Sequence, residues 1–142
     1  MYHFDILAQP APRQVEPGEP LLLVGRHWPT VRRPVKAGPV GARSFEESLT
    51  SLERLPRMFV EPDGSFVWVG GGDPTWQVDG NLFDQEDELA YVVLKGHCPP
   101  GSFDELLRCF GWPVTPMVFQ LSREGVYVDE VTFRELAERP PR

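Results

Sequence analysis

Apolar and polar residues alternate around a turn near the middle of the chain. Residues 58–69 read MFVEPDGSFVWV, in which EPDGS separates two runs of strand-forming residues. Pro62 and Asp63 suit a type I turn, and Gly64 suits the left-handed residue that follows such a turn. The pattern predicts a β-hairpin over 58–69.

A second and longer hairpin is predicted over residues 76–94. Val78 and Leu82 alternate with polar or small residues, and the polar residues 85–87 reverse the chain. The returning stretch 89–94 is apolar at nearly every position. Such a strand is expected near the centre of a sheet, covered on both faces.

Three stretches carry apolar residues at the spacing of one helix face, namely 45–55, 103–110 and 130–138. Ser44 and Glu47 have the spacing of a capping box at the start of the first helix. These helices are therefore expected to be amphipathic and to turn one side toward a sheet.

The second and third helices have start signals of their own. Ser102 and Glu105 have the spacing of another capping box, and Asp129 is a candidate cap for the last helix. Gly111 is expected to adopt the left-handed conformation that commonly ends a helix.

The remaining segments are short strands and one long connection. Residues 2–7 and 21–25 are expected to be strands, the second of them buried, and 117–121 and 126–128 should form a strand pair. Residues 27–41 contain three prolines and two glycines, a composition that predicts a long loop.

These elements predict an α+β fold. We expect an antiparallel meander sheet of about five or six strands, with two or three helices packed mainly on one face. The predicted core consists of Leu49, Leu52, Phe59, Val67, Val78, Leu82, Tyr91, Val93, Phe103, Leu106, Leu107, Phe119, Leu121 and Leu136.

The chain has the length of one domain, residues 1–142, with a loop-rich part over 1–43 and regular elements over 44–139. Its net charge of −7 disfavours nucleic acid and anionic membranes as partners. The N-terminal residues do not resemble a signal peptide, and no apolar run is long enough to span a bilayer. Two cysteines make no disulfide framework, so a cytoplasmic location is expected.

Both cysteines fall in one stretch, GHCPPGSFDELLRCFGW, which also contains His97. Cys98 precedes a predicted helix, whose dipole favours a thiolate, but the side chain of His97 alternates to the other side of an extended chain. The spacing of His97, Cys98 and Cys109 matches no zinc motif. We therefore interpret the stretch as a strand-to-helix connection with packed cysteines, and we expect neither a metal nor a cofactor.

Two other stretches suggest ion sites that their context does not support. The glycine-rich residues 70–74 precede a strand rather than the helix that a phosphate loop requires. The acidic residues around 84–88 lack the ligand alternation and the central glycine of an EF-hand loop. An acidic, solvated surface of the two hairpins is the simpler interpretation.

Basic residues gather instead in the proline-rich connection. The stretch has no acidic residue between Glu19 and Glu46, and we expect it to fold back in part onto the acidic hairpins. Its candidate binding residues are Arg26, His27, Trp28, Arg32, Arg33 and Lys36.

Two functional hypotheses remain. The first is a non-catalytic soluble binding or scaffold module that uses this basic surface for an acidic protein or for self-association. No catalytic residue is assigned under it, and an enzyme is the less favoured class. The second is a small enzyme whose site assembles in three dimensions around His97, Cys98 and acidic residues of the central hairpins. A deep polar pocket would favour the enzyme, and a flat apolar patch would favour binding.

Overall fold

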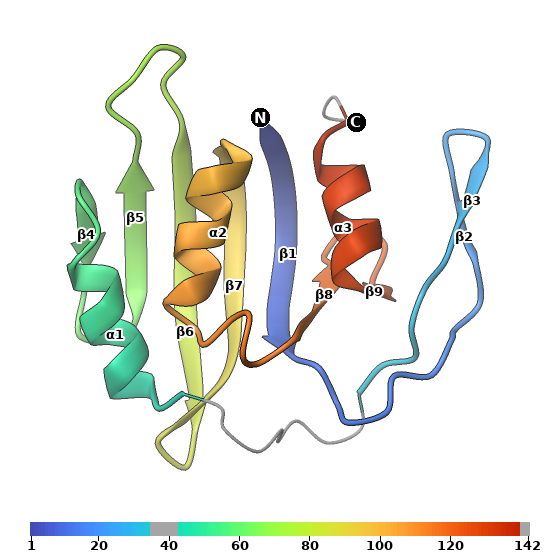
Figure 1. Cartoon of the computed structure of the whole chain (residues 1–142), viewed down its shortest axis with the longest axis horizontal. Coiled ribbons are helices and arrows are strands. Elements are labelled where there is room, and N and C mark those ends of the chain that lie inside the picture. Colours follow the sequence, from blue (N-terminus) through green and yellow to red (C-terminus); the bar gives the residue numbers. More distant parts are fainter. Residues whose placement is uncertain (35–42, 140–142) are drawn as a thin grey trace.

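The chain folds around one antiparallel sheet of seven strands (Figure 1). The computed structural model describes residues 1–34 and 43–139. In spatial order the strands are β4 (Met58–Val60), β5 (Ser65–Val69), β6 (Gln77–Gln85), β7 (Glu88–Cys98), β1 (Tyr2–Pro10), β8 (Met117–Leu121) and β9 (Tyr127–Val128).

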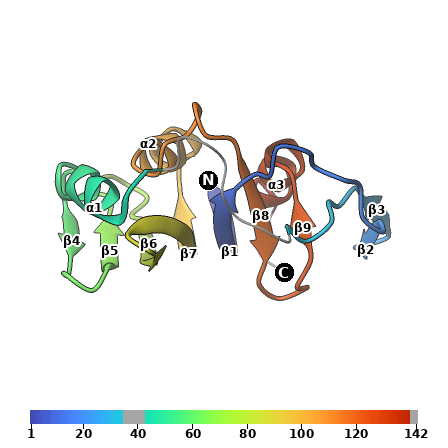
Figure 2. The same cartoon turned by 90° about the horizontal axis from the view of Figure 1, so that it is seen from below.

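Three helices lie on the same face of this sheet (Figure 2). They are α1 (Phe45–Glu53), α2 (Pro100–Arg108) and α3 (Glu130–Ala137). The predicted α+β class, with helices on one face, is therefore confirmed. None of these described helices has the length and apolar character needed to cross a lipid bilayer.

The sheet is larger than expected and is not a simple meander. β1, the first strand of the chain, lies between β7 and β8 and pairs with both of them. The chain start therefore joins the hairpins of the middle region to the strand pair near the end. This insertion was not predicted, because strand order depends on contacts between distant segments.

A separate two-stranded hairpin lies beyond the β9 edge, formed by β2 (Leu21–Leu23) and β3 (Arg26–Trp28). β3 begins just before the region predicted as a loop, residues 27–41, and occupies its first two positions. The prediction that residues 21–25 are a buried strand is wrong in part, because β2 ends at Leu23 and its middle residue, Leu22, is exposed.

The core fills the space between the sheet and the helices. Eight of the predicted core residues are buried there: Leu52, Val78, Leu82, Phe103, Leu106, Leu107, Phe119 and Leu121. In the first hairpin, the prediction of which residues point into the core is wrong. Phe59 and Val67 are 65% and 36% exposed, whereas Phe66 and Trp68 point inward. Both faces of this hairpin are apolar, so alternation alone could not tell which one is covered.

β7 is the central strand, as predicted, but its two faces differ. Val92 and Leu94 are fully buried on the helix side, while Tyr91 and Val93 are half-buried on the other. The ring of Tyr91 stacks on that of Phe83 in β6, with centroids 4.7 Å apart. Cross-strand stacking between neighbours thus accounts for apolar residues on a face that no described helix covers.

The helix ends follow from local chemistry, with one correction. The capping box of Ser44 and Glu47 is present, and Asp129 caps α3 by accepting the Thr132 N–H. α2 begins at Pro100, not near Ser102, and its start has no side-chain cap. Proline at the first helical position already has the backbone angle of a helix and lacks the N–H that a cap would satisfy.

One charged network ties two helices to the sheet. The guanidinium of Arg134 in α3 lies 2.7 Å from Asp104 of α2 and 2.9 Å from Glu130 of its own helix. It also donates a hydrogen bond to the hydroxyl of Tyr2 in β1, at 3.3 Å. These three contacts raise the pKa of Arg134 despite its partial burial, so the charge is held firmly at neutral pH.

Candidate functional site

The site begins where two neighbouring strands separate. β8 pairs with β1 from Ile6 to Pro10, and the N–H of Ser122 then donates to the carbonyl of Asp5 at 3.1 Å. Beyond that contact the chain turns away into the Ser122–Gly125 reversal. The first residues of β1 therefore continue along β7 alone, and the sheet opens beside them.

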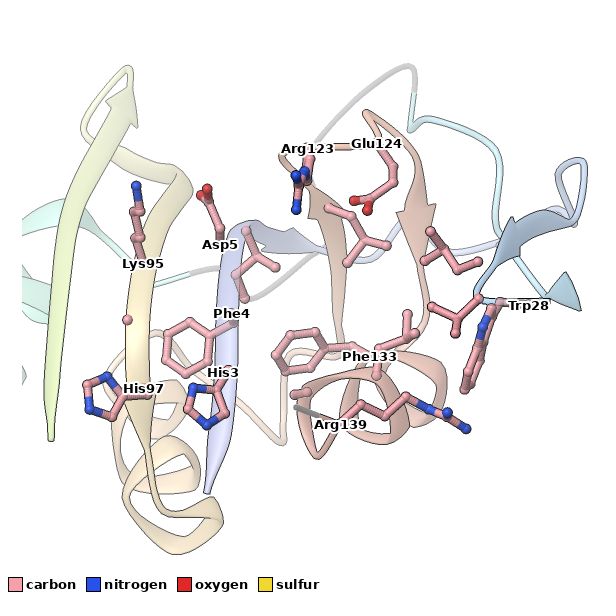
Figure 3. Close-up of a pocket in the computed structure, with 17 residues that line it drawn as sticks. His3, Phe4, Asp5, Trp28, Lys95, His97, Arg123, Glu124, Phe133 and Arg139 are labelled. Atoms are coloured by element: carbon pink, nitrogen blue, oxygen red, sulfur yellow. The ribbon is translucent and has the colours of Figure 1, made fainter. Parts of the chain in front are cut away.

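A cleft of about 660 Å³ occupies this opening. Figure 3 shows the ring of Phe133, from α3, between β1 and β8. The floor and sides are apolar and consist of Phe4, Ile6, Leu121, Phe133, Leu136 and Ala137. Helix α3 is amphipathic, so the side that packs on the sheet also supplies apolar side chains to the cleft.

The β2–β3 hairpin forms one wall of the cleft. Leu23, Val24 and Trp28 contribute to it, and Trp28 is only 2% exposed. The guanidinium carbons of Arg26 and Arg139 lie 3.9 and 4.7 Å from the Trp28 ring centroid. These cation–π contacts hold the indole in place.

A pair of histidines borders the cleft at its other end (Figure 3). His3 of β1 and His97 of β7 are directly opposite each other, and their rings stack with centroids 5.6 Å apart and planes 11° from parallel. Burial lowers the pKa of His3, and the charges of His97 and of the N-terminal amine lower it further. Two imidazoles this close disfavour being protonated together.

Charged residues complete the rim. Asp5 and Lys95 are opposite each other, two pairs along from the histidines and therefore on the same sheet face. Arg123 and Glu124 follow β8, and Arg139 follows α3. Three cationic side chains and two carboxylates therefore line the cleft besides the histidines. This local balance is positive, whereas the whole chain has a net charge of −7.

The residues predicted as a basic binding surface are only partly brought together. Trp28 lines the cleft and Arg26 supports it, but His27, Arg32 and Arg33 are exposed and do not line it. Lys36 lies outside the described residues.

The ion pairs of this segment differ from those expected. Arg32 lies 3.2 Å from Glu16, and Arg26 lies 3.5 Å from Glu135 of α3. Neither carboxylate belongs to the acidic hairpins. The N-terminal segment and α3 are simply nearer, because the hairpins occupy the opposite end of the sheet.

The cysteines point away from the cleft histidines. Cys98 is fully buried on the helix side of β7, and burial raises its pKa to about 12. Burial also raises the pKa of Cys109 to about 11, and its thiol donates to the carbonyl of Glu105 at 3.5 Å. At neutral pH both groups are protonated thiols, which are poor nucleophiles.

The acidic residues of the central hairpins do not line the cleft. Within residues 1–34 and 43–139, histidine, cysteine and carboxylate side chains form no group of three or more suited to a metal ion. The cleft thus combines an apolar interior with a charged rim, an arrangement suited to holding a ligand by its shape and charge.

Comparison with known proteins adds no relative. No family model, no curated protein and no solved structure matches this chain.

The residues of the cleft were mostly missed by sequence reasoning. His3 and His97 meet only because β1 inserts beside β7, and Phe133 reaches the cleft only because β8 diverges from β1. Two sequence signals did point here, namely Trp28 within a run of arginines and His97, which was a candidate of the enzyme hypothesis.

Proposed function

We propose that this protein is a non-catalytic binding module and that its ligand occupies the cleft between β1, β8, α3 and the β2–β3 hairpin. The observation that carries the proposal is the cleft itself, which is neither a deep polar pocket nor a flat apolar patch but a concave site with an apolar interior. Its volume of about 660 Å³ falls in the range of small-molecule sites, and its interior is apolar with charged groups at the edge.

The competing enzyme hypothesis receives less support from the geometry. It requires His97 and Cys98 to act together, but they lie on opposite faces of β7. Burial raises the pKa of Cys98 to about 12, so its thiol is protonated at neutral pH and is a poor nucleophile. Among the described residues that line the cleft, no serine, threonine or cysteine accompanies the histidine pair, so binding accounts for the arrangement with fewer assumptions.

A neutral fluorescent probe tests the proposal. Phenylnaphthylamine is apolar, and its emission rises when it leaves water, so a saturable rise on titration reports binding. The Leu136→Trp variant places an indole in the cleft, where Leu136 is half-buried. We expect its affinity for the probe to be lower by about tenfold or more, because the apolar surface available for burial is filled.

Leu49→Trp is the matched control. Leu49 is also a half-buried helix leucine packed against the core, but it lies on α1, away from the cleft. This variant should bind the probe like the parent, provided thermal melts show that both variants fold. Equal affinity in both variants, or no saturable binding to the parent, would reject the cleft as a ligand site.

A further inference from the structure

The distribution of charge around the cleft narrows the class of ligand. Opposite residues on neighbouring strands share one face, so His3, His97 and Lys95 stand together on β1 and β7. Lys95 is exposed, and among the described residues it forms no ion pair. This end of the cleft therefore presents one permanent cation and two protonatable rings.

Two acidic groups stand beside this charge and offset it in part, but neither forms an ion pair with Lys95. Asp5 and Asp79 flank Lys95 on β1 and β6, and neither lies within ion-pair distance of it. Gln77, the residue of β6 opposite His97, is neutral, and its amide donates to Asp79 at 2.9 Å.

We infer that the cleft takes an amphipathic anion, whose apolar part lies against α3 and whose anionic group lies at the His3, His97 and Lys95 end. This inference rests on the proposed function. A ring or short chain bearing a carboxylate or sulfonate has this chemistry. An anion in this place favours the protonated form of His3, so binding is coupled to proton uptake.

Two dyes with the same ring system provide the experiment. Anilinonaphthalenesulfonate carries a sulfonate that phenylnaphthylamine lacks, so the ratio of their dissociation constants isolates the contribution of the anionic group. We expect the sulfonate to bind more tightly than the neutral dye. Lys95→Gln should weaken sulfonate binding by about fivefold and leave the neutral dye unchanged.

Arg33→Gln is the control for net charge, because it removes one exposed cation away from the cleft. It should leave both affinities within about twofold of the parent. If Lys95→Gln and Arg33→Gln change the sulfonate affinity equally, the anionic group is not held at this end and the inference is wrong.

The histidines are tested by pH. Because the pKa of His3 lies below its ordinary value of about 6.5, sulfonate affinity should rise as the pH falls from about 7 to about 5 and His3 takes up a proton, and neutral-dye affinity should stay constant. The double variant His3→Gln with His97→Gln should lose this rise. A pH-independent sulfonate affinity in the parent would overturn the inference.

The two proposals fail in different ways. If the neutral dye binds and Leu136→Trp weakens its binding, but the sulfonate dye binds no more tightly than the neutral dye, only the inference about the anion is wrong. If Leu136→Trp changes neither affinity, the cleft is not a ligand site and both proposals are wrong.

Discussion

Helices α2 and α3 have similar sequences in outline but different surroundings. Both are short amphipathic helices that pack on the same face of the sheet. The apolar side of α2 is sealed, and Phe103, Leu106 and Leu107 have no exposed surface. The corresponding side of α3 lies behind the opening between β1 and β8. Phe133 and Ala137 are nearly as buried, at 1% and 2% exposure, but they and the half-buried Leu136 line a cleft.

The difference arises from the strands and not from the helices. The sheet remains paired between β6, β7 and β1, whereas β8 leaves β1 after Ile6. The same helical pattern thus gives a closed core in one place and a candidate binding site in the other. A period of 3.6 residues identifies the face that packs, but it does not tell whether the packing is complete.

The largest expected effect is on stability, at a pair of neighbouring aromatic residues whose rings are tilted by 32°. Phe103→Ala removes a fully buried ring from the sealed side and should cost about 3–5 kcal/mol of unfolding free energy. Phe133→Ala should cost less, by roughly 1 kcal/mol or more, because the space it leaves joins the cleft and can be hydrated. Urea unfolding of the two variants measures both values.

This order is the sharpest stability test of the comparison. Both residues are phenylalanines of one aromatic cluster, with their ring centroids 5.2 Å apart, so the two variants remove the same side chain. A larger loss for Phe133→Ala than for Phe103→Ala would mean that α3 is sealed as completely as α2.

The charged network between the two helices should have the next largest effect. Arg134→Met removes contacts with Asp104, Glu130 and Tyr2 and leaves two carboxylates close together. We expect a loss of about 2–3 kcal/mol in unfolding free energy, because hydrogen bonds to charged groups are stronger than neutral ones. Without this network, α3 should also be held less firmly over the cleft.

Arg26→Met provides the comparison for Arg134→Met. Its ion pair with Glu135 is half-exposed, at 3.5 Å, and such pairs contribute only about 0–1 kcal/mol. Losses of equal size in the two variants would show that the network does not anchor α3. Chemical denaturation at the same ionic strength gives both numbers.

The smallest expected effect is the pH dependence of stability that arises from His3, on the sheet face that the helices leave uncovered. Because the folded pKa of His3 is below its ordinary value, the unfolded chain binds this proton more readily. The contribution of His3 is fully present above about pH 6.5 and is lost as the pH falls toward the lowered folded pKa. The melting temperature should therefore decrease on acidification from about pH 7.5 to pH 5.5.

His3→Gln should make this decrease shallower, whereas His27→Gln, at an exposed position on β3, should retain it. Thermal melts across the pH series provide the measurement. If the melting temperature of His3→Gln falls with pH as steeply as that of the parent, a group other than His3 takes up the proton. The argument that charge repulsion destabilises the histidine pair would then be wrong.

Much of the local structure was predictable, because its causes are local. The Ser44 capping box and the Asp129 cap formed as expected, and the reversal at 85–87 uses left-handed Glu86 and Asp87. Such signals act within a few residues and need no knowledge of the rest of the chain.

The candidate site depended on causes that a single sequence does not display. Which face of 58–69 is covered was undecided, because Phe59 and Val67 are as apolar as Phe66 and Trp68. The cleft requires strand order, the divergence of β8 and the docking of the β2–β3 hairpin together. Each of these depends on long-range packing, which local patterning does not encode.

The central claim is that apolar side chains of α3, unlike those of α2, can be reached by a ligand through the sheet. Methyl-detected NMR during titration with phenylnaphthylamine tests it most directly. We predict that Leu136 and Ala137 shift and broaden while Leu106 and Leu107 stay in place. Shifts confined to α2, or equal shifts on both helices, would contradict the account.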